Sequence, residues 1–129
     1  MLRFIKILIP ILFLASCGLK PSIEDPKLSD RVFSLEEFFD GETVAHGQFQ
    51  DVLGNVSLRF LVNIKGSWDG SDLVLVEDFT YEDGYEEQRI WTLTKIGKNG
   101  WAGSAEGVIG TAEGKTNGDM FYWAYTIDL

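Results

Sequence analysis

Cysteine, proline and histidine are scarce in this chain of 129 residues. It has a single cysteine, Cys17, so neither an intramolecular disulfide nor a cluster of thiolate metal ligands can form. It has three prolines, which leaves long stretches free to pair as strands. His46 is the only histidine, and no other residue in the sequence is recognisable as a partner that would orient it as a general base. We therefore expect His46 at the surface or on a strand edge, without a catalytic or metal-binding role.

Positive charge is also scarce. The chain has 11 Lys and Arg against 20 Asp and Glu, a net charge of −9. Arg3 and Lys6 precede Cys17 and every acidic residue follows it, so nine cations face 20 acids after Cys17, a net charge of −11. A domain with this charge repels phosphate backbones and anionic lipid headgroups. We therefore expect no nucleic-acid partner, and no membrane attachment through a basic patch.

The first 17 residues have the three parts of an export signal. Arg3 and Lys6 give a positive start, residues 7–15 are apolar except for Pro10, and small residues precede Cys17. The tetrapeptide Leu-Ala-Ser-Cys that ends at Cys17 resembles the lipobox of bacterial lipoproteins. This resemblance implies a signal peptide over residues 1–16, cleavage before Cys17, and attachment of acyl chains such as palmitate to Cys17, which anchor the protein in a membrane.

The residues after the cysteine predict where the protein lies and how it is attached. Gly18 follows Cys17, whereas an aspartate there is the usual signal for retention in the inner membrane of enteric bacteria. The resemblance therefore implies an outer-membrane lipoprotein that faces the periplasm. Residues 17–32 are polar, contain Pro21 and Pro26, and are predicted to be a lipidated tether before a domain at 33–129.

A short helix is predicted at the start of this domain, over residues 33–41. Ser34 and Glu37 have the spacing of a capping box, and Phe33 and Phe38 have that of a hydrophobic staple. Gly41 stands where the helix would end.

Period-two alternation dominates the rest of the chain. Between Val56 and Trp68, apolar residues alternate with polar ones over a length that predicts one long strand with a wet face. Further strands are predicted at 42–50, 73–81, 88–96, 101–109 and 120–129, separated by turns rich in Asn-Gly and Asp-Gly. The expected fold is all-β, an antiparallel meander that curls into a barrel or half-barrel.

The chain resembles the bacterial lipoproteins of domain-of-unknown-function family 3833, which is lipocalin-like. The matching residues are Leu35–Gly41, Gly47–Asp51, Ile64–Gly66, Trp68, Asp78, Phe79, Tyr81, Asp83, Gly84, Arg89, Trp91, Val108–Gly110, Asn117, Gly118, Trp123 and Tyr125. The family's function is unknown, but its members often lie near genes for modifying membrane fatty acids, which implies an acyl-chain ligand. The family pattern continues for several strands beyond Leu129. We therefore expect the domain to be incomplete at its C-terminus, with an open sheet edge that makes it poorly stable or prone to aggregation.

Aromatic side chains are the candidates for a binding site. Side chains on the strand faces could line an apolar pocket or fill the core of the barrel. The candidate ligand-binding residues are Phe60, Trp68, Phe79, Arg89, Trp91, Trp123 and Tyr125. Arg89, like Arg59, lies among apolar residues, where it could pair with a carboxylate head group of a ligand or with a structural acid.

Nothing in the sequence predicts an enzyme or a cofactor. The acidic clusters at 69–72 and 82–87 lack the spacing of a calcium loop and are expected to be solvated turns. No phosphate-binding loop or nucleophile elbow is present. The expected function is that of a membrane-anchored periplasmic lipoprotein that binds an apolar or acyl-chain ligand. The alternative is a structural or interaction lipoprotein of the cell envelope without a small-molecule ligand.

Overall fold

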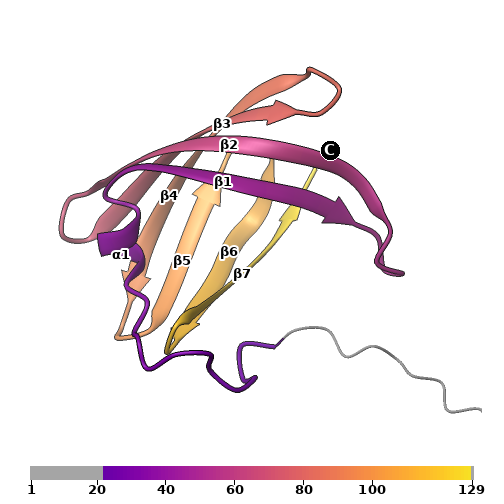
Figure 1. Cartoon of the computed structure of the whole chain (residues 1–129). Helices are drawn as coiled ribbons and strands as arrows, with labels where there is room; N and C mark the ends of the chain where they lie inside the picture. Colours follow the sequence, from indigo (N-terminus) through magenta and orange to yellow (C-terminus); the bar gives the residue numbers. More distant parts are fainter. Residues whose placement is uncertain (1–21, 129) are drawn as a thin grey trace, which may run out of the picture.

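One antiparallel sheet forms almost all of the protein (Figure 1). The structure is a computed structural model that describes residues 22–128. Its elements are α1 (Leu35–Phe38), β1 (Gly41–Gln50), β2 (Val56–Trp68), β3 (Asp72–Tyr81), β4 (Glu86–Ile96), β5 (Gly100–Ala105), β6 (Val108–Asn117) and β7 (Met120–Ile127). The strands pair in sequence order, which confirms the predicted all-β meander with one short N-terminal helix. The predicted signal peptide and Cys17 lie outside the described residues.

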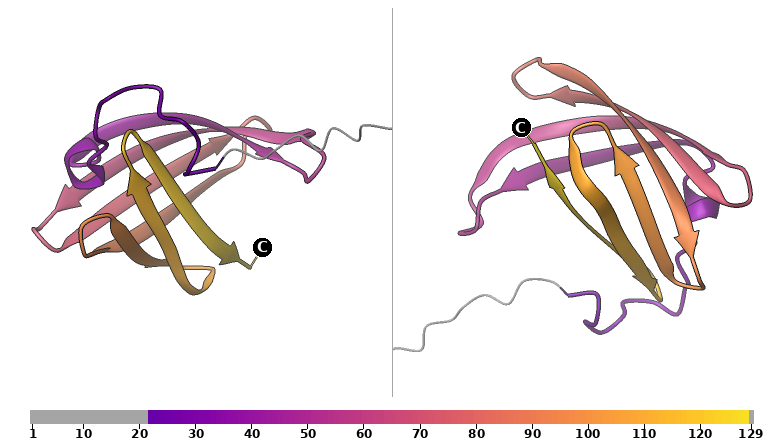
Figure 2. Two further views of the ribbon diagram at one scale, coloured as in Figure 1. Left: turned by 90° about the horizontal axis from the view of Figure 1, so that it is seen from below. Right: turned by 180° about the vertical axis from the view of Figure 1, so that it is seen from behind.

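The sheet curls into a half-barrel around its apolar face (Figures 1 and 2). Strand twist and the irregular pairing at Phe49/Gln50 and at Ile109/Glu113 bend the ladder. Within residues 22–128, β1 pairs with β2 alone and β7 with β6 alone, so these two strands form the edges of the sheet. No helix in this part of the chain has the length and apolarity needed to cross a membrane.

The concave face of the sheet carries the core. Alternate residues of the central strands point inward, as the period-two pattern predicts. The buried residues are Leu35, Val62, Ile64, Leu73, Leu75, Phe79, Tyr81, Trp91, Leu93, Trp101 and Ala112. They form one continuous cluster, with half-buried aromatics packed against it.

Helix α1 covers one end of this concave face (Figure 1). Leu35 is 1% exposed, and the rings of Phe33 and Phe38 lie 5.2 Å apart, as the predicted staple requires. The predicted capping box is wrong, because the side chain of Ser34 makes no capping hydrogen bond to the helix backbone. This single helical turn is held instead by the burial of Leu35 and by an ion pair between Glu36 and Lys95 of β4.

The strand predicted over residues 101–109 is two strands. A two-residue turn at Glu106-Gly107, in which Gly107 has a φ of +81°, separates β5 from β6. Strand β6 continues to Asn117 through a stretch that had no strand prediction. Its inward positions include Ala112 and Gly114, which are too small to give a clear apolar alternation.

The described part of the predicted tether lies along the β6–β7 hairpin (Figure 2). The backbone N–H of Phe33 donates to the carbonyl of Gly118 at 2.7 Å, and the N–H of Ser29 donates to Asp119 at 2.9 Å. The amide of Asn117 donates to the carbonyl of Ile23 at 2.8 Å. Residues 22–33 are therefore tied to the hairpin turn.

Candidate functional site

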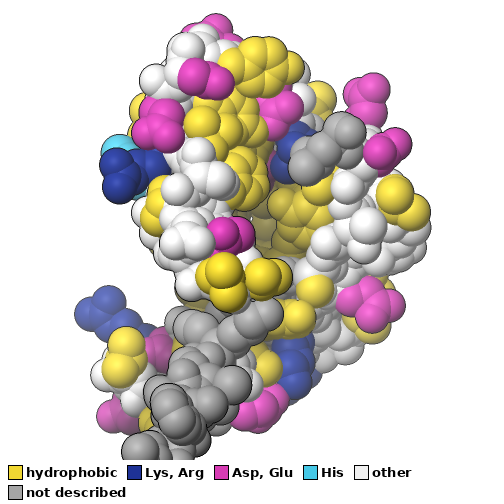
Figure 3. Space-filling view, turned by 90° about the vertical axis from the view of Figure 1, so that its right-hand side faces the viewer, with side chains coloured by type: hydrophobic (Ala, Val, Ile, Leu, Met, Phe, Trp, Pro, Cys, Tyr) yellow, Lys and Arg dark blue, Asp and Glu magenta, His cyan; other side chains and the backbone are white. Residues whose placement is uncertain are grey.

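The concave face encloses an inner cavity of about 270 Å³ that is open to solvent. Figure 3 shows a hollow floored by hydrophobic side chains. The cavity is lined by Leu35, Phe39, Ala45, Phe49, Phe60, Val62, Ile64, Leu75, Glu77, Phe79, Arg89, Trp91, Leu93, Phe121, Trp123 and Tyr125. All but two of these side chains are apolar or aromatic, so the wall favours a hydrocarbon ligand.

The structure brings most of the predicted binding residues to this one cavity. Its wall includes Phe60, Phe79, Arg89, Trp91, Trp123 and Tyr125. Trp68 does not line the cavity, because its ring packs against Trp101, 5.9 Å away. Six of the seven predicted binding residues therefore line the cavity, whereas Trp68 belongs to a separate aromatic pair.

A larger outer hollow of about 650 Å³ adjoins the inner cavity. Phe49, Arg89 and Tyr125 line both spaces, so the two meet at these side chains. The outer hollow is further lined by Ser57, Leu58, Tyr81, Asp83, Tyr85, Glu87 and Ile127. Charged and hydroxyl-bearing residues are more frequent in this lining than in that of the inner cavity, although the exposed surface of both spaces is mainly apolar.

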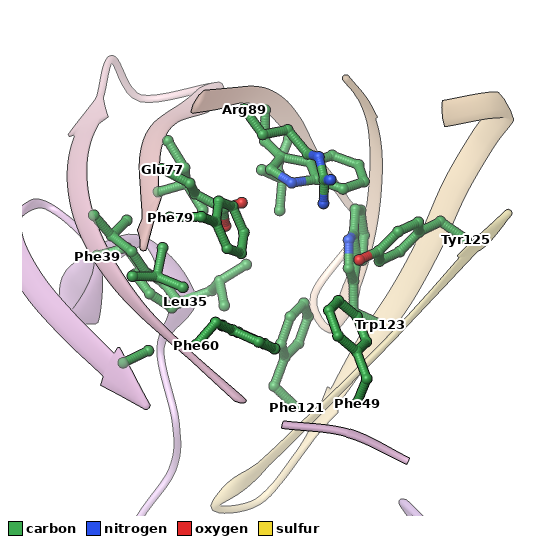
Figure 4. Close-up of a pocket in the computed structure, with 16 residues that line it drawn as sticks. Leu35, Phe39, Phe49, Phe60, Glu77, Phe79, Arg89, Phe121, Trp123 and Tyr125 are labelled. Atoms are coloured by element: carbon green, nitrogen blue, oxygen red, sulfur yellow. The ribbon is translucent and has the colours of Figure 1, made fainter. Parts of the chain in front are cut away.

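Glu77 places a carboxyl group in the apolar inner wall. It takes an inward position of β3 between Leu75 and Phe79, and Figure 4 shows its carboxyl directed into the cavity. Burial raises the pKa of Glu77 from 4.5 to about 7, although the charge of Arg89 and a hydrogen bond from Trp91 act in the opposite direction. Near neutral pH this carboxyl therefore exchanges between its charged and neutral forms.

Arg89 lies where the inner cavity meets the outer hollow. It is the register partner of Glu77, and its guanidinium lies 5.3 Å from the centre of the Phe79 ring. Its Nη2 donates to Glu87 at 3.3 Å, which is the structural pairing that the sequence left open. Glu87 also accepts a hydrogen bond from the hydroxyl of Tyr81.

Tyr81 adds a neutral donor to this network. Burial, with the hydrogen bond and charge of Glu87, raises the pKa of the Tyr81 phenol above its ordinary value. The phenol therefore stays protonated and continues to donate to Glu87 throughout the neutral range. The network at the junction of the two spaces is Tyr81–Glu87–Arg89, with Glu77 deeper inside.

Glycines seat the aromatic wall against the sheet. A Cβ atom at Gly103 would lie 2.8 Å from the ring of Trp123, and one at Gly114 would overlap the same indole. The missing side chains let Trp123 lie flat over β5 and β6. Its ring then meets Trp91 at 5.5 Å, and Trp91 meets Tyr125 at 5.0 Å.

The remaining polar candidates lie outside the two spaces. His46 is exposed on β1, as predicted, and Arg59 is exposed on β2. Among residues 22–128, no group of three His, Cys, Asp or Glu side chains has the geometry of a metal site. The acidic cluster at 69–72 forms a turn in which Asp69 accepts from the backbone of Ser71 and Asp72 at 2.8 and 2.7 Å.

Sequence reasoning missed Glu77 and part of the apolar wall, including Phe39, Phe49 and Phe121. For Glu77 a signal was present, because it shares the phase of Leu73, Leu75, Phe79 and Tyr81 in the alternation of β3. Phe39 and Phe121 come from opposite ends of the domain, and only the curl of the sheet brings them to one space (Figure 4).

Comparison with known proteins agrees with the family resemblance. No curated protein and no solved structure matches the chain. One family model matches residues 11–129, which is nearly the whole sequence. The chain therefore belongs to the family described as "Protein of unknown function (DUF3833)".

Proposed function

We propose that this protein is a lipid-anchored component of the bacterial cell envelope that binds a ligand with an acyl chain in its inner cavity. The observation that carries the proposal is the open cavity continuous with the core, whose wall is apolar except for Glu77 and Arg89. Binding of a hydrocarbon chain against such a wall stabilises the complex by about 25 cal/mol per Å² of apolar surface removed from water. The anchor is attached at Cys17, and the domain faces the periplasm from the outer membrane.

The dimensions of the site support this function. The outer hollow is within the range of roughly 300–1,000 Å³ that is typical of small-molecule sites, and the inner cavity extends it into the core. The aromatic rings offer broad apolar contact, while the polar groups gather at the junction of the two spaces. An amphiphile matches this distribution, with its tail inside and its head group at the junction.

Ligand binding is tested by extracting the protein from its native membrane and identifying co-purifying molecules by mass spectrometry. We expect an acyl-chain lipid in near-stoichiometric amount with the native chain. Preparations that retain no lipid, and that bind none when acyl ligands are added, would favour the alternative, an envelope lipoprotein with a structural or interaction role.

Ligand binding should also change tryptophan fluorescence in a residue-specific way. Trp91 and Trp123 line the cavity, whereas Trp68 packs against Trp101 outside it. We expect Trp123→Phe to remove about half of the fluorescence change that an acyl ligand causes, because two indoles lie in the wall. The matched variant Trp68→Phe should keep the change. Equal loss in both variants would place the ligand elsewhere.

The anchor is tested by replacing Cys17 with serine. Without the thiol no acyl chain is attached, and each buried CH₂ of such chains contributes about 0.8 kcal/mol to membrane binding. We expect Cys17→Ser to move the protein from the membrane fraction to the soluble periplasmic fraction, or to leave it as an uncleaved precursor. A cleaved variant that still sediments with membranes would contradict the lipid anchor.

A further inference from the structure

The charged groups in the site limit the head group that a ligand can carry. In the described residues, Glu77 and Arg89 are the charged side chains of the inner wall, and Asp83 and Glu87 join Arg89 in the outer hollow. One guanidinium and three carboxyl groups therefore line the two spaces. It is already committed to Glu87 at 3.3 Å and stands beside Glu77 in the register.

A free carboxylate head group fits this arrangement poorly. To reach Arg89 it would have to approach Glu87 and Glu77, and like charges placed together in a partly desolvated site are strongly unfavourable. The side chain of Arg89 is only 15% exposed, so water screens this repulsion weakly.

An ammonium head group fits poorly for the opposite reason. At the depth of Glu77 it would meet the guanidinium of Arg89, whose side chain lies on the adjacent strand of the same wall (Figure 4). Glu77 is also a weak counter-ion, because burial keeps much of it neutral near neutral pH.

An uncharged head group with both a donor and an acceptor satisfies the pair. An oxygen can accept from Arg89, while a hydroxyl or amide N–H can donate to Glu77. We propose, building on the acyl-chain function above, that the ligand is a neutral amphiphile such as an acylglycerol or fatty amide, with its head group between Glu77 and Arg89 and its tail against the aromatic wall.

Few other groups influence Glu77. Arg89 and Trp91 face it from β4, and the β2 neighbours Val62 and Ile64 are apolar. Across the cavity, Tyr125 of β7 is the titratable side chain of the far wall, and α1 contributes Leu35 to the lining. A tail that displaces water from this space disfavours the charged form of Glu77, so a neutral amphiphile binds more tightly as pH falls.

The test compares three probes that share one tail: monodecanoylglycerol, decanoate and decylammonium. Binding to the full chain is measured by calorimetry at about pH 7, where both ionic probes are charged and much of Glu77 is neutral. We expect monodecanoylglycerol to bind at least about tenfold more tightly than either ion. Equal binding of all three, or tighter binding of an ion, overturns the proposal about the head group but leaves the acyl-chain function standing. Binding of none of them overturns both.

A variant identifies Glu77 as the selecting group. Glu77→Gln keeps the shape and removes the charge, so decanoate should gain several-fold in affinity while monodecanoylglycerol changes less than about twofold. Asp78→Asn is the matched control, because Asp78 is exposed on the other face of β3, where it accepts a hydrogen bond from Gln88. It should leave all three affinities unchanged. If Asp78→Asn changes selectivity as much as Glu77→Gln does, the assignment to Glu77 is wrong. If Glu77→Gln does not fold, the comparison of the three probes on the unmodified chain still tests the proposal.

Discussion

Replacing Gly66 with alanine is expected to lower the free energy of unfolding by about 3 kcal/mol. Gly66 takes an inward position of β2, directly against the chain that leaves α1. A Cβ atom there would overlap the backbone carbonyl oxygen of Phe39 and approach Leu75 at 3.1 Å. The carbonyl belongs to the backbone, so rotation of a side chain cannot relieve the overlap, and the helix must move away from the sheet.

The measurement is denaturant unfolding of the full chain, followed by circular dichroism. Ser67→Ala is the matched control, because Ser67 is the next residue of β2 and its side chain is exposed on the opposite face. It should change the midpoint little. A Gly66→Ala protein as stable as the control would show that α1 is not packed as closely on β2 as described.

The same substitution should affect the cavity. Leu35, the first residue of α1, and Phe39, the residue after its end, line the inner wall. Displacing the helix opens that end of the wall to water, and we expect weaker acyl-chain binding by Gly66→Ala together with lower stability. Gly66 is thus a residue through which helix packing and the site are coupled.

The strands were predictable where bulky apolar residues alternate strictly with small or polar ones. In β2 and β3 most inward positions hold bulky apolar side chains, so period two is visible in the sequence itself. In β6 the inward positions include Ala112 and Gly114, because the indole of Trp123 occupies the space above them. That exchange of volume between neighbouring strands is a tertiary property. The turn at Glu106-Gly107, by contrast, has a local signal in Gly107, whose φ is +81°, and the prediction overlooked it.

The site was predictable in its chemistry and less so in its composition. Aromatic residues on strand faces predicted an apolar wall, and the curl of the sheet places six of the seven candidate residues on that wall. Trp68 has the right alternation but lies near the far end of β2, where Trp101 is its neighbour. Alternation determines which face a side chain occupies, whereas its position along the cavity depends on the register between strands.

Replacing Glu77 with glutamine should stabilise the protein by up to about 3 kcal/mol at about pH 8. The pKa of Glu77 is about 7 in the folded chain, against 4.5 in the unfolded one. Between these values the folded state binds more protons than the unfolded state, so the free energy of unfolding falls as pH rises through this window. Above about pH 7 the full cost of a buried charge is present, and below about pH 4.5 it is absent.

Glutamine keeps the shape of Glu77 and a polar group for Trp91 but carries no charge, so this pH dependence should disappear. Unfolding midpoints of both proteins, measured from about pH 5 to about pH 8, should diverge as pH rises. Asp78→Asn, on the exposed face of β3, should follow the unmodified protein across the range. Parallel curves for the unmodified protein and Glu77→Gln would mean that Arg89 holds Glu77 fully charged, and that the inner wall carries an ion pair near neutral pH in place of an exchanging carboxyl group.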